Sequence, residues 1–502
     1  MMSSLYTGAS GLKTHGEGMG VVSNNISNIN TIGYKQMAMQ YSELMSQYMT
    51  SSAGNSTNIS QKGMGAAVGA TRTLFTQGGL EAASSSTDLL INGKGFFGVA
   101  SDGKTHYTRA GNFRFNKDGE LLDASGWNVL GRPIVNGTEG ATQPITLDMS
   151  QGGMGYLPPQ ATSTVTSASN LGGLEDKHPN PDSPFFSMAS SWDGTASLPL
   201  PGGSYSYSEA IQFYDSGGTL QSGTIYYDAA GKSGGSSVTE YLVAMDPSKD
   251  GSAKAGTSAA GLLMAGTLTF STGGQLTNLT AFNPPASGTP SDLGGWTPAA
   301  LKDGQPVFTV QPAGAAEQSI TLDMGFVFGP DASSSAGLAS AAEAAANPQA
   351  IYNASAGSSR KEYCSTAYSE APGGLRAGRD GYTGGTLRDV QVSQDGVISG
   401  VYSNNQTQEL YRISMYRFTS EDGLRQEGNN HFSATQESGA AEEGVAGEEN
   451  FGTLTANALE QSNVDYAREF SLLIVTQRGF QMNSKVITTT DTLLQKALEL
   501  KR

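Results

Sequence analysis

Side chains at heptad spacing occur at both ends of the chain, and this pattern constrains the fold more than any other feature. The N-terminal seam, at steps of three and four, consists of Leu5, Gly8, Leu12, His15, Met19, Val22, Ile26 and Ile29. The C-terminal seam consists of Leu473, Phe480, Ile487 and Leu494, is extended by Phe470 and Leu498, and is widened by Leu472, Val486 and Leu493. Its other edge is expected to hold Gln477, Ser484 and Asp491. The spacing predicts two helices.

Two arrangements of these helices are open. Each could be an ordinary amphipathic helix packed on its own domain. Residues 1–70 and 453–502, however, share a net charge of +1, and their heptad segments are of similar length. We therefore expect the two ends to pair with each other and with neighbouring copies of the chain.

Local signals set the expected limits of these helices. Asn30 and Gly33 predict the end of the first helix, and Ser462 followed by Asp465 predicts the cap of the last one. Residues 34–48 predict a further amphipathic helix. Its expected apolar face consists of Tyr34, Met37, Tyr41, Leu44 and Tyr48.

Glycine is unusually frequent in the first helix, at Gly8, Gly11, Gly16, Gly18 and Gly20. Each costs about 1 kcal/mol relative to alanine in a helix interior, so the five cost roughly 5 kcal/mol. We expect both ends to be disordered in the monomer and to fold on assembly, with Ile26 as a decisive position in the seam.

Charge and composition exclude several classes of protein. The net charge is −16, and since both ends are slightly positive, residues 71–452 carry −18. Nucleic acid and anionic membranes are therefore not expected partners. There is no apolar stretch of membrane length, no basic and apolar signal segment, and one cysteine, Cys364. These absences fit a cytoplasmic protein, or one exported by a machine that needs no cleaved signal.

Between the ends the sequence has the texture of β-strands and turns. Short apolar runs in residues 87–131 and 380–432 are separated by Asp-Gly pairs, which predict hairpins. The four pairs begin at Asp102, Asp118, Asp395 and Asp422. Residues 160–363 are also β-patterned and predict an inserted outer domain, with a short helix at 339–346.

We therefore expect a mainly β, multidomain chain with helical, coiled-coil ends. The expected domains are a terminal helical one (1–70 with 453–502), a discontinuous inner β domain (71–159 with 364–452), and one or more inserted outer β domains (160–363).

Chemistry is not expected at the candidate motifs. Residues 93–98 fit G-x-G-x-x-G, but aromatic hairpin texture follows instead of a helix, which disfavours a dinucleotide site. The histidines, His15, His106, His178 and His431, lie far apart in sequence and lack metal-ligand spacing. Spacing leaves a Cys364–histidine pair open, although a lone cysteine is more often a small packing residue. The pairs Glu442-Glu443 and Glu448-Glu449 predict a solvated acidic loop rather than a calcium site.

Three blocks of sequence resemble one family. Residues 23–35, Ser-Asn-Asn-Ile-Ser-Asn-Ile-Asn-Thr-Ile-Gly-Tyr-Lys, resemble the signature shared by flagellar rod, hook and hook-associated proteins. Residues 91–97 (Ile-Asn-Gly-Lys-Gly-Phe-Phe) and 107–113 (Tyr-Thr-Arg-Ala-Gly-Asn-Phe) look like the inner β domain of these proteins. Residues 458–465 and 477–483 are similar to their C-terminal helix.

The middle of the chain favours a hook protein within this family. Residues 395–408 resemble the part of the hook's inner domain that follows the outer domain, and distal rod proteins generally lack so large an insertion. The resemblance implies that paired terminal helices form an inner tube, surrounded by a discontinuous β domain and then by outer β domains. It implies a flexible tubular polymer that transmits torque from rod to filament, exported through its own core and located outside the cell.

The resemblance also implies partners. They are copies of the chain itself, the distal rod protein, the hook cap protein, the hook–filament junction protein and the flagellar type III export apparatus. No cofactor, metal or catalytic residue is implied. The candidate assembly residues are Leu5, Leu12, Met19, Val22, Asn24, Asn25, Ile26, Asn28, Ile29, Val464, Phe470, Leu473, Phe480, Ile487, Leu494 and Leu498.

Two alternatives stay open from the sequence. The Asn side chains at 24, 25, 28 and 30 either cap the helix end or cross-link backbone groups of neighbouring subunits. For the whole chain, a rod or hook-associated relative would share both ends. A secreted β-rich hydrolase or adhesin would need a catalytic or ligand-binding constellation, and it leaves the terminal heptads unexplained.

Overall fold

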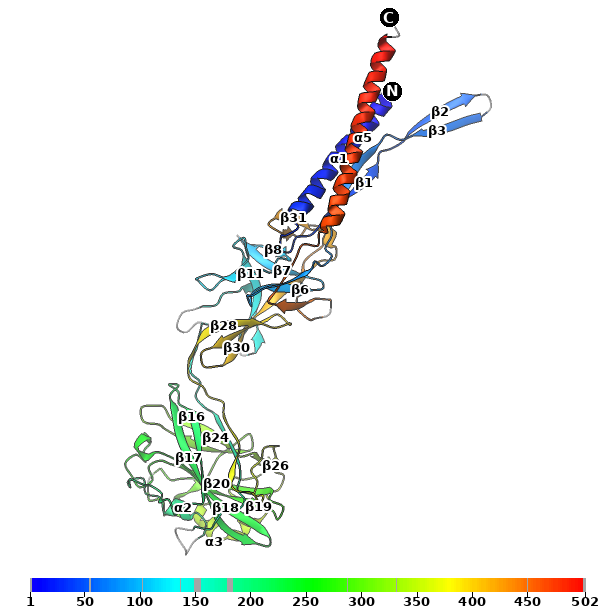
Figure 1. Ribbon diagram of the computed structural model, residues 1–502. Coiled ribbons are helices and arrows are strands. Elements are labelled where there is room, and N and C mark those ends of the chain that lie inside the picture. Colours follow the sequence, from blue (N-terminus) through cyan, green and yellow to red (C-terminus); the bar gives the residue numbers. More distant parts are fainter. Residues whose placement is uncertain are drawn as a thin grey trace. The chain divides into compact units, whose positions relative to one another are not determined.

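The computed structural model describes residues 2–53, 56–101, 103–135, 137–148, 155–177, 184–286, 288–330, 332–448 and 450–499. The chain forms two compact units (Figure 1). The first combines residues 1–156 with 386–502, and the second consists of residues 157–385. Among the described residues, no helix is long and apolar enough to cross a membrane.

Two long helices bring the chain ends together in the first unit. They are α1 (Met2–Ser27) and α5 (Tyr466–Glu499), which lie side by side and run antiparallel (Figure 1). The predicted helices at both ends are thus confirmed. The cap differs in detail from the prediction. Asp465 Oδ1 accepts the backbone N–H of Arg468 at 2.9 Å, whereas the Ser462 hydroxyl oxygen accepts the N–H of Val464, which lies ahead of the helix.

The helix predicted at residues 34–48 is wrong. This segment contains β1 (Met37–Glu43), which pairs with β4 (Ala66–Thr73), and begins β2 (Gln47–Ala53), which pairs with β3 (Ser56–Lys62). Large side chains at 37, 39 and 41 fit a period of two, while those at 34, 37, 41, 44 and 48 fit a helical period, so the pattern was ambiguous. Packing decides it, since β1 and β4 both lie against α1.

The β part of the first unit is built around one long central strand, β30 (Thr407–Arg417), which pairs with β29, β11, β7 and β33. Strands from both halves of the sequence thus share one sheet. The other strands of this part are β5 (Leu80–Ala82), β6 (Leu89–Asn92), β7 (Phe96–Ser101), β8 (Lys104–Thr108), β9 (Arg114–Phe115), β10 (Leu121–Leu122), β11 (Asn128–Val135), β12 (Thr138–Glu139), β13 (Gln143–Pro144), β14 (Tyr156–Leu157), β28 (Gly385–Val392), β29 (Val397–Tyr402), β31 (Arg425–Gly428), β32 (His431–Ser433), β33 (Glu442–Val445), β34 (Thr453–Ala456) and β35 (Ala458–Glu460).

The hairpins predicted from Asp-Gly pairs are mostly confirmed. Gly119 and Gly396 adopt positive φ between the paired strands β9–β10 and β28–β29. Gly103 does so between β7 and β8, while Asp102 lies outside the described residues. The fourth pair is an exception, because Asp422-Gly423 belongs to the 3₁₀ turn η3 (Glu421–Gly423).

Two further segments considered in the sequence analysis belong to strands of this unit. The G-x-G-x-x-G segment leads into strand β7 rather than a helix. Glu442-Glu443, expected in a solvated loop, lies on strand β33, where Arg417 and Arg132 pair with the two carboxylates. Glu449 lies outside the described residues. Among the residues that the structure describes, no group of three or more His, Cys, Asp or Glu could hold a metal ion.

The second unit contains a six-stranded antiparallel sheet and a five-stranded sheet. The first has the order β16-β17-β18-β19-β20-β21, and the second β22-β23-β24-β15-β27. The elements of this unit are β15 (Thr164–Asn170), α2 (Ser187–Ser190), β16 (Tyr207–Tyr214), β17 (Leu220–Ser233), β18 (Ser236–Met245), η1 (Pro247–Lys249), β19 (Leu262–Phe270), β20 (Leu276–Asn283), η2 (Leu293–Gly295), β21 (Thr297–Pro298), β22 (Leu301–Lys302), β23 (Gln305–Val310), β24 (Gln318–Asp323), β25 (Phe326–Val327), α3 (Ala341–Ala346), α4 (Pro348–Tyr352), β26 (Ser359–Arg360) and β27 (Gly373–Arg379). Helix α3 confirms the short helix predicted at 339–346.

The core of the second unit includes side chains from both of its sheets. Tyr227 and Tyr241 from the first sheet share one buried cluster with Phe308 and Ile320 from the second. Cys364 belongs to the same cluster, and burial raises the pKa of its thiol to about 11. At neutral pH the thiol is therefore protonated, which disfavours a nucleophilic role. His178, one of the histidines considered with it, lies outside the described residues.

The first unit brings two distant histidines onto one tryptophan. Trp127 stacks on His431 at 4.0 Å between ring centroids, and the His106 ring centroid lies 4.7 Å from that of Trp127. His431 Nε2 is 2.5 Å from Asp123 Oδ2, and both side chains are buried. Burial lowers the pKa of His106. Burial raises the pKa of Asp123, but hydrogen bonds from His431 and from backbone N–H groups outweigh it and lower the pKa overall.

Acidification is therefore expected to destabilise the first unit. A lowered histidine pKa means that the unfolded chain takes up the proton first, so this stability is lost as the pH falls below about 6.5. The lowered pKa of Asp123 adds a loss at more acidic pH. The check is hydrogen exchange of β8 and β32 between pH 7.5 and 5, compared with His106→Gln. The variant should show a shallower pH dependence, and identical profiles would contradict this account.

Candidate assembly site at the junction of the chain ends

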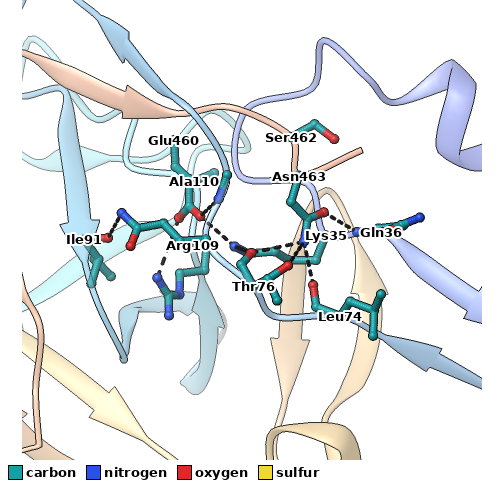
Figure 2. A network of polar contacts seen from close by, with 12 residues as sticks. Lys35, Gln36, Leu74, Thr76, Ile91, Arg109, Ala110, Glu460, Ser462 and Asn463 are labelled. Carbon is teal, nitrogen blue, oxygen red and sulfur yellow. Dashed lines mark hydrogen bonds and ion pairs between the residues drawn. The ribbon is translucent and has the colours of Figure 1, made fainter. Parts of the chain in front are cut away.

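A buried ion pair joins the segment after α1 to the segment before α5. Lys35 Nζ lies 2.6 Å from Glu460 Oε1, and neither side chain is exposed (Figure 2). Lys35 also donates to the carbonyl oxygen of Thr76 at 2.8 Å, and the same Glu460 oxygen accepts the N–H of Gly78 at 2.8 Å. Burial lowers the pKa of Lys35, which Glu460 opposes. The pair fixes both chain ends to the β part of the first unit.

A second cation shares the same carboxylate. Arg109 Nη1 lies 3.6 Å from Glu460 Oε2, and the arginine side chain is 2% exposed (Figure 2). Its guanidinium carbon lies 5.3 Å from the centroid of the Phe96 ring. Burial lowers the pKa of Arg109, although arginine stays charged at neutral pH. Two buried cations thus face one buried carboxylate.

Asn463 completes the link between the two ends. Its Oδ1 accepts the backbone N–H of Gln36 at 2.7 Å, and its Nδ2 donates to the carbonyls of Leu74 and Thr76 (Figure 2). One amide therefore bridges three segments. The backbone N–H of Gly33 also donates to the carbonyl of Glu460 at 2.8 Å.

Gly33 shows why a residue of the first motif must be glycine. Its φ is +70°, and a Cβ built there would lie 2.6 Å from the backbone nitrogen of Ala110. The left-handed conformation and the contact both exclude a larger residue. The first and second motif blocks of the sequence thus touch at this position.

The asparagines at the end of α1 divide into two groups. Asn25 is buried, and its amide pairs with both backbone groups of Met37, donating to the carbonyl at 2.8 Å and accepting the N–H at 3.0 Å. It also donates to Glu469 of α5 at 3.2 Å. Asn25 therefore bonds within its own subunit. Asn24 and Asn30 are exposed and Asn28 is half-buried, so a contact with a neighbouring copy stays a prediction for these three.

The seam between α1 and α5 has one apolar and one polar edge. The predicted apolar edge faces α1: Gly8 lies against Ile487, and Gly16 against Phe480. Leu473 and Leu494 share this edge and are half-buried. The polar edge is shifted by one residue from the prediction, because Thr476, Asn483 and Thr490 take the places expected for Gln477, Ser484 and Asp491.

The glycines of α1 allow this close approach. A Cβ at Gly11 would lie 2.7 Å from the amide of Asn483, and a Cβ at Gly479 of α5 would lie 2.7 Å from the ring of His15. A Cβ at Gly18 would meet Tyr41 of β1 at the same distance. Glycine lowers the helical propensity at these positions, but it allows the helix to make close contacts with α5 and with β1.

The remaining candidate residues of the sequence differ in exposure. Val22 and Val464 are buried, and Leu5, Leu12, Met19, Ile26 and Ile29 are half-buried. Phe470 and Leu498 are exposed, so they do not belong to the seam within the subunit.

Helix α5 has an unusual distribution of side chains. Its three buried residues are Glu469, Thr476 and Thr490, all of them polar. Its exposed large apolar side chains are Tyr466, Phe470, Leu472, Ile474, Val475, Phe480, Met482, Val486, Leu493 and Leu498. Val475, Met482, Val486 and Leu493 recur at steps of seven and four and therefore share one side of the helix, and we refer to these four residues as the outer apolar face of α5. An isolated subunit leaves this face in water.

Sequence reasoning missed the charged residues of the junction. Lys35, Arg109 and Glu460 each stand inside a motif block, but their partners lie up to 425 residues away in the chain. The available signal was that Lys35 and Arg109 are the lone charged residues of their blocks, whereas Glu460 shares its block with Asp465.

Comparisons with known proteins match the chain almost from end to end. Family models match at residues 5–35 (Flagella basal body rod protein), 90–164 (Flagellar hook protein FlgE/F/G D1 domain), 189–382 (Flagellar basal body protein FlaE D2 domain) and 455–500 (Flagellar basal body rod FlgEFG protein C-terminal). These models follow one another in the order expected from the motif blocks.

Three relatives that match along almost the whole chain are described as flagellar hook proteins. The flagellar hook protein FlgE of Treponema pallidum is 29% identical over 522 residues, and that of Borreliella burgdorferi is 29% identical over 521 residues, with 100% of each chain covered. The Escherichia coli hook protein is 28% identical over 98% of both chains. Among solved structures, the Helicobacter pylori flagellar hook protein FlgE2 matches with a TM-score of 0.45 and 14% identity, covering 76% of this chain and 100% of that one.

Proposed function

The chain belongs to the flagellar hook protein family, the structural subunits of the bacterial flagellar hook, and we propose that its paired ends build the inner tube of that polymer. The single observation that carries the proposal is the outer apolar face of α5, combined with the polar residues that α5 buries. In a polymer, exposed apolar side chains of this kind are covered by other copies of the same chain.

The energetics favour assembly over an isolated helix pair. Covering one large apolar side chain stabilises by up to about 1.5–3 kcal/mol, and the outer apolar face offers four of them on one helix. The seam inside the subunit offers much less, because its polar edge consists of Thr476, Asn483 and Thr490 and its α1 side is rich in glycine. Helix α5 therefore gains most of its burial from neighbouring copies.

We further propose a division of labour along the chain. The terminal segments 1–70 and 453–502 form the inner tube, residues 71–159 with 364–452 form the middle layer, and residues 160–363 face outward. The acidic middle of the chain supports solvated, sliding contacts there, and the apolar α5 face supports persistent contacts inside.

The remaining partners follow from the position of a hook in the flagellum. We propose that the distal rod protein binds one end of the polymer and that the hook cap and the hook–filament junction protein bind the other. Export by the flagellar type III apparatus, without a cleaved signal, completes this proposal. The family itself is a structural one, and the proposed role of the chain is mechanical.

Electron microscopy of the purified chain tests the proposed function. We expect seeded polymerisation to give short, curved tubes, and a variant lacking residues 466–499 to give none, since it lacks the outer apolar face. Straight tubes would assign the chain to the rod instead. No tubes from the parent chain under any seeded condition would overturn the proposal.

A further inference from the structure

His15 of α1 lies on a glycine of α5. A Cβ at Gly479 would be 2.7 Å from Cε1 and 2.8 Å from Nε2 of the His15 ring, so the ring fills the space that a side chain would need there. We call this space the notch of Gly479. The ring also approaches Tyr41 of β1, with 6.4 Å between the ring centroids. Among the described residues, the enclosed Nδ1 of His15 makes no hydrogen bond, so shape decides where the ring lies.

The same arrangement occurs in reverse one turn along the helix pair. Here the notch is on α1, since a Cβ at Gly11 would lie 2.7 Å from the side-chain amide of Asn483. Asn483 Nδ2 donates to the carbonyl oxygen of Gly479 at 3.0 Å, which holds the amide in place. Gly11 and His15 are four residues apart on α1, as are Gly479 and Asn483 on α5. Each helix thus contributes one notch and one side chain on the same face.

Two flanking contacts continue the same register. A Cβ at Gly8 would lie 3.0 Å from Cγ1 of Ile487, and a Cβ at Gly18 would lie 3.5 Å from Cγ2 of Thr476. The position on α1 rises from 8 to 18 while the position on α5 falls from 487 to 476, as an antiparallel pair requires. All four contacts therefore belong to one axial offset of the two helices.

The composition of α5 makes this offset unique. Gly479 is the one glycine among residues 466–499. Sliding α5 by one turn in either direction would bring Val475 or Asn483 opposite His15, and each of these side chains would overlap the ring. Glycine disfavours a helix interior, so its single use at this point indicates a packing requirement. The contact of His15 with Gly479 therefore selects the register.

We propose that the two reciprocal contacts, His15 on Gly479 and Asn483 on Gly11, lock the register and the rotation of α5 against α1, and thereby direct the outer apolar face of α5 toward the next copy. The inference deepens the proposed function and rests on it. We refer to the two contacts as the register lock.

The register lock acts at a distance from the junction of the chain ends. The junction holds α5 at Glu469, which is bonded to Asn25, and Gly479 follows ten residues later, about 15 Å along the helix. Beyond the junction, a slip of one turn would move the outer apolar face by about 5.4 Å, and a rotation by one residue would turn it by about 100°. Equivalent copies in a polymer must present the same face in the same place, so a single register is required.

Seeded polymerisation of matched variants tests the register lock. Gly479→Ala adds a methyl group against the His15 ring and is expected to raise the critical concentration about tenfold, although alanine favours the helix. His15→Ala alone empties the notch and should raise the critical concentration less. Combining the two substitutions removes the overlap, so the double variant should come within about threefold of the parent.

The second contact supplies crossed controls. Gly11→Ala should be rescued by Asn483→Ala but not by His15→Ala, and Gly479→Ala should not be rescued by Asn483→Ala. Gly20→Ala makes the same change in α1 at an exposed glycine whose Cβ would have nothing within 4 Å, so this variant should polymerise as well as the parent or better.

Thiol labelling of the tubes reports on the direction of the outer apolar face. A thiol introduced by Met482→Cys should be protected in otherwise parental tubes and labelled faster in tubes of Gly479→Ala, formed above its critical concentration. Adding His15→Ala should restore the protection. The parent chain, with Cys364 as its one native thiol, gives the background.

The proposal is overturned if Gly479→Ala polymerises like the parent, or if matched and crossed combinations rescue equally. It is also overturned if Gly20→Ala is as harmful as Gly479→Ala, because the harm would then come from alanine in a terminal helix and not from a filled notch. Equal labelling of the thiol with and without Gly479→Ala would contradict it as well. All of these comparisons start from tubes of the parent chain, so they are distinct from a failure of the proposed function.

Discussion

Met482→Asp is expected to abolish tube formation while leaving the subunit folded. Met482 is 71% exposed on α5, so the substitution removes little packing inside the subunit. In the tube the same position is covered by another copy, where the carboxylate loses its hydration and the methionine burial of about 1.5–3 kcal/mol is lost. Sedimentation and electron microscopy should show monomers only. Circular dichroism of the variant should match that of the parent monomer.

Gln481→Asp is the matched control. It introduces the same charge one residue away, at an exposed polar position outside the outer apolar face. Tubes should still form from this variant, with at most a modest rise in critical concentration. If both variants polymerise alike, the outer apolar face is not an interface. Val475→Asp, at a position 65% exposed on the same face, should repeat the effect of Met482→Asp.

Glu460→Gln is expected to destabilise the first unit by about 3–5 kcal/mol, because it leaves Lys35 and Arg109 buried without their shared carboxylate. Hydrogen exchange of β35 and of its partner β5 reports on this unit separately from the second one. Protection of both strands should fall sharply, and the link between the chain ends should open first. Exchange in the second unit should stay unchanged.

Glu442→Gln provides the comparison for this loss. It makes the same substitution at an ion pair with Arg417, whose two side chains are 30% and 53% exposed. Exposed pairs contribute about 0.2–1 kcal/mol, so this variant should be close to the parent. Equal effects of the two substitutions would show that the buried cluster does not hold the chain ends.

The heptad patterns in the sequence were sufficient to predict the terminal helices. Heptad spacing over about six turns distinguishes a helix from a strand. The predicted edge of α5 at Phe480 and Ile487 does face α1. Asp-Gly pairs were sufficient for three of the four hairpins, because positive φ at the glycine is a local requirement.

Short patterns did not predict the structure correctly where tertiary contacts decide between a helix and a strand or between two edges of a helix. Met37 and Tyr41 fit a helix face and also a strand face, and only the partner strand β4 and the glycines of α1 select the strand. The polar edge of α5 was shifted by one residue for a related reason. Glycine in α1 leaves room for Thr476 and Asn483, so polar side chains occupy positions where a leucine zipper would place apolar ones.

The junction could not be predicted because its partners are distant in sequence. Lys35, Arg109 and Glu460 become a cluster only when β35 lies beside the segment after α1. The different roles of the asparagines could not be predicted for the same reason. Asn24 and Asn25 are neighbours in the motif, and only the packing of the helix end decides that Asn25 is buried and Asn24 is exposed.

An electron cryo-microscopy map of the assembled tube, at a resolution that shows side chains, tests the central claim most directly. The account predicts that α1 and α5 of each subunit stay paired and that Val475, Met482 and Leu493 are buried against helices of other copies. A map in which these three side chains face solvent or an open channel, with the polymer held together only through the β parts, would contradict it.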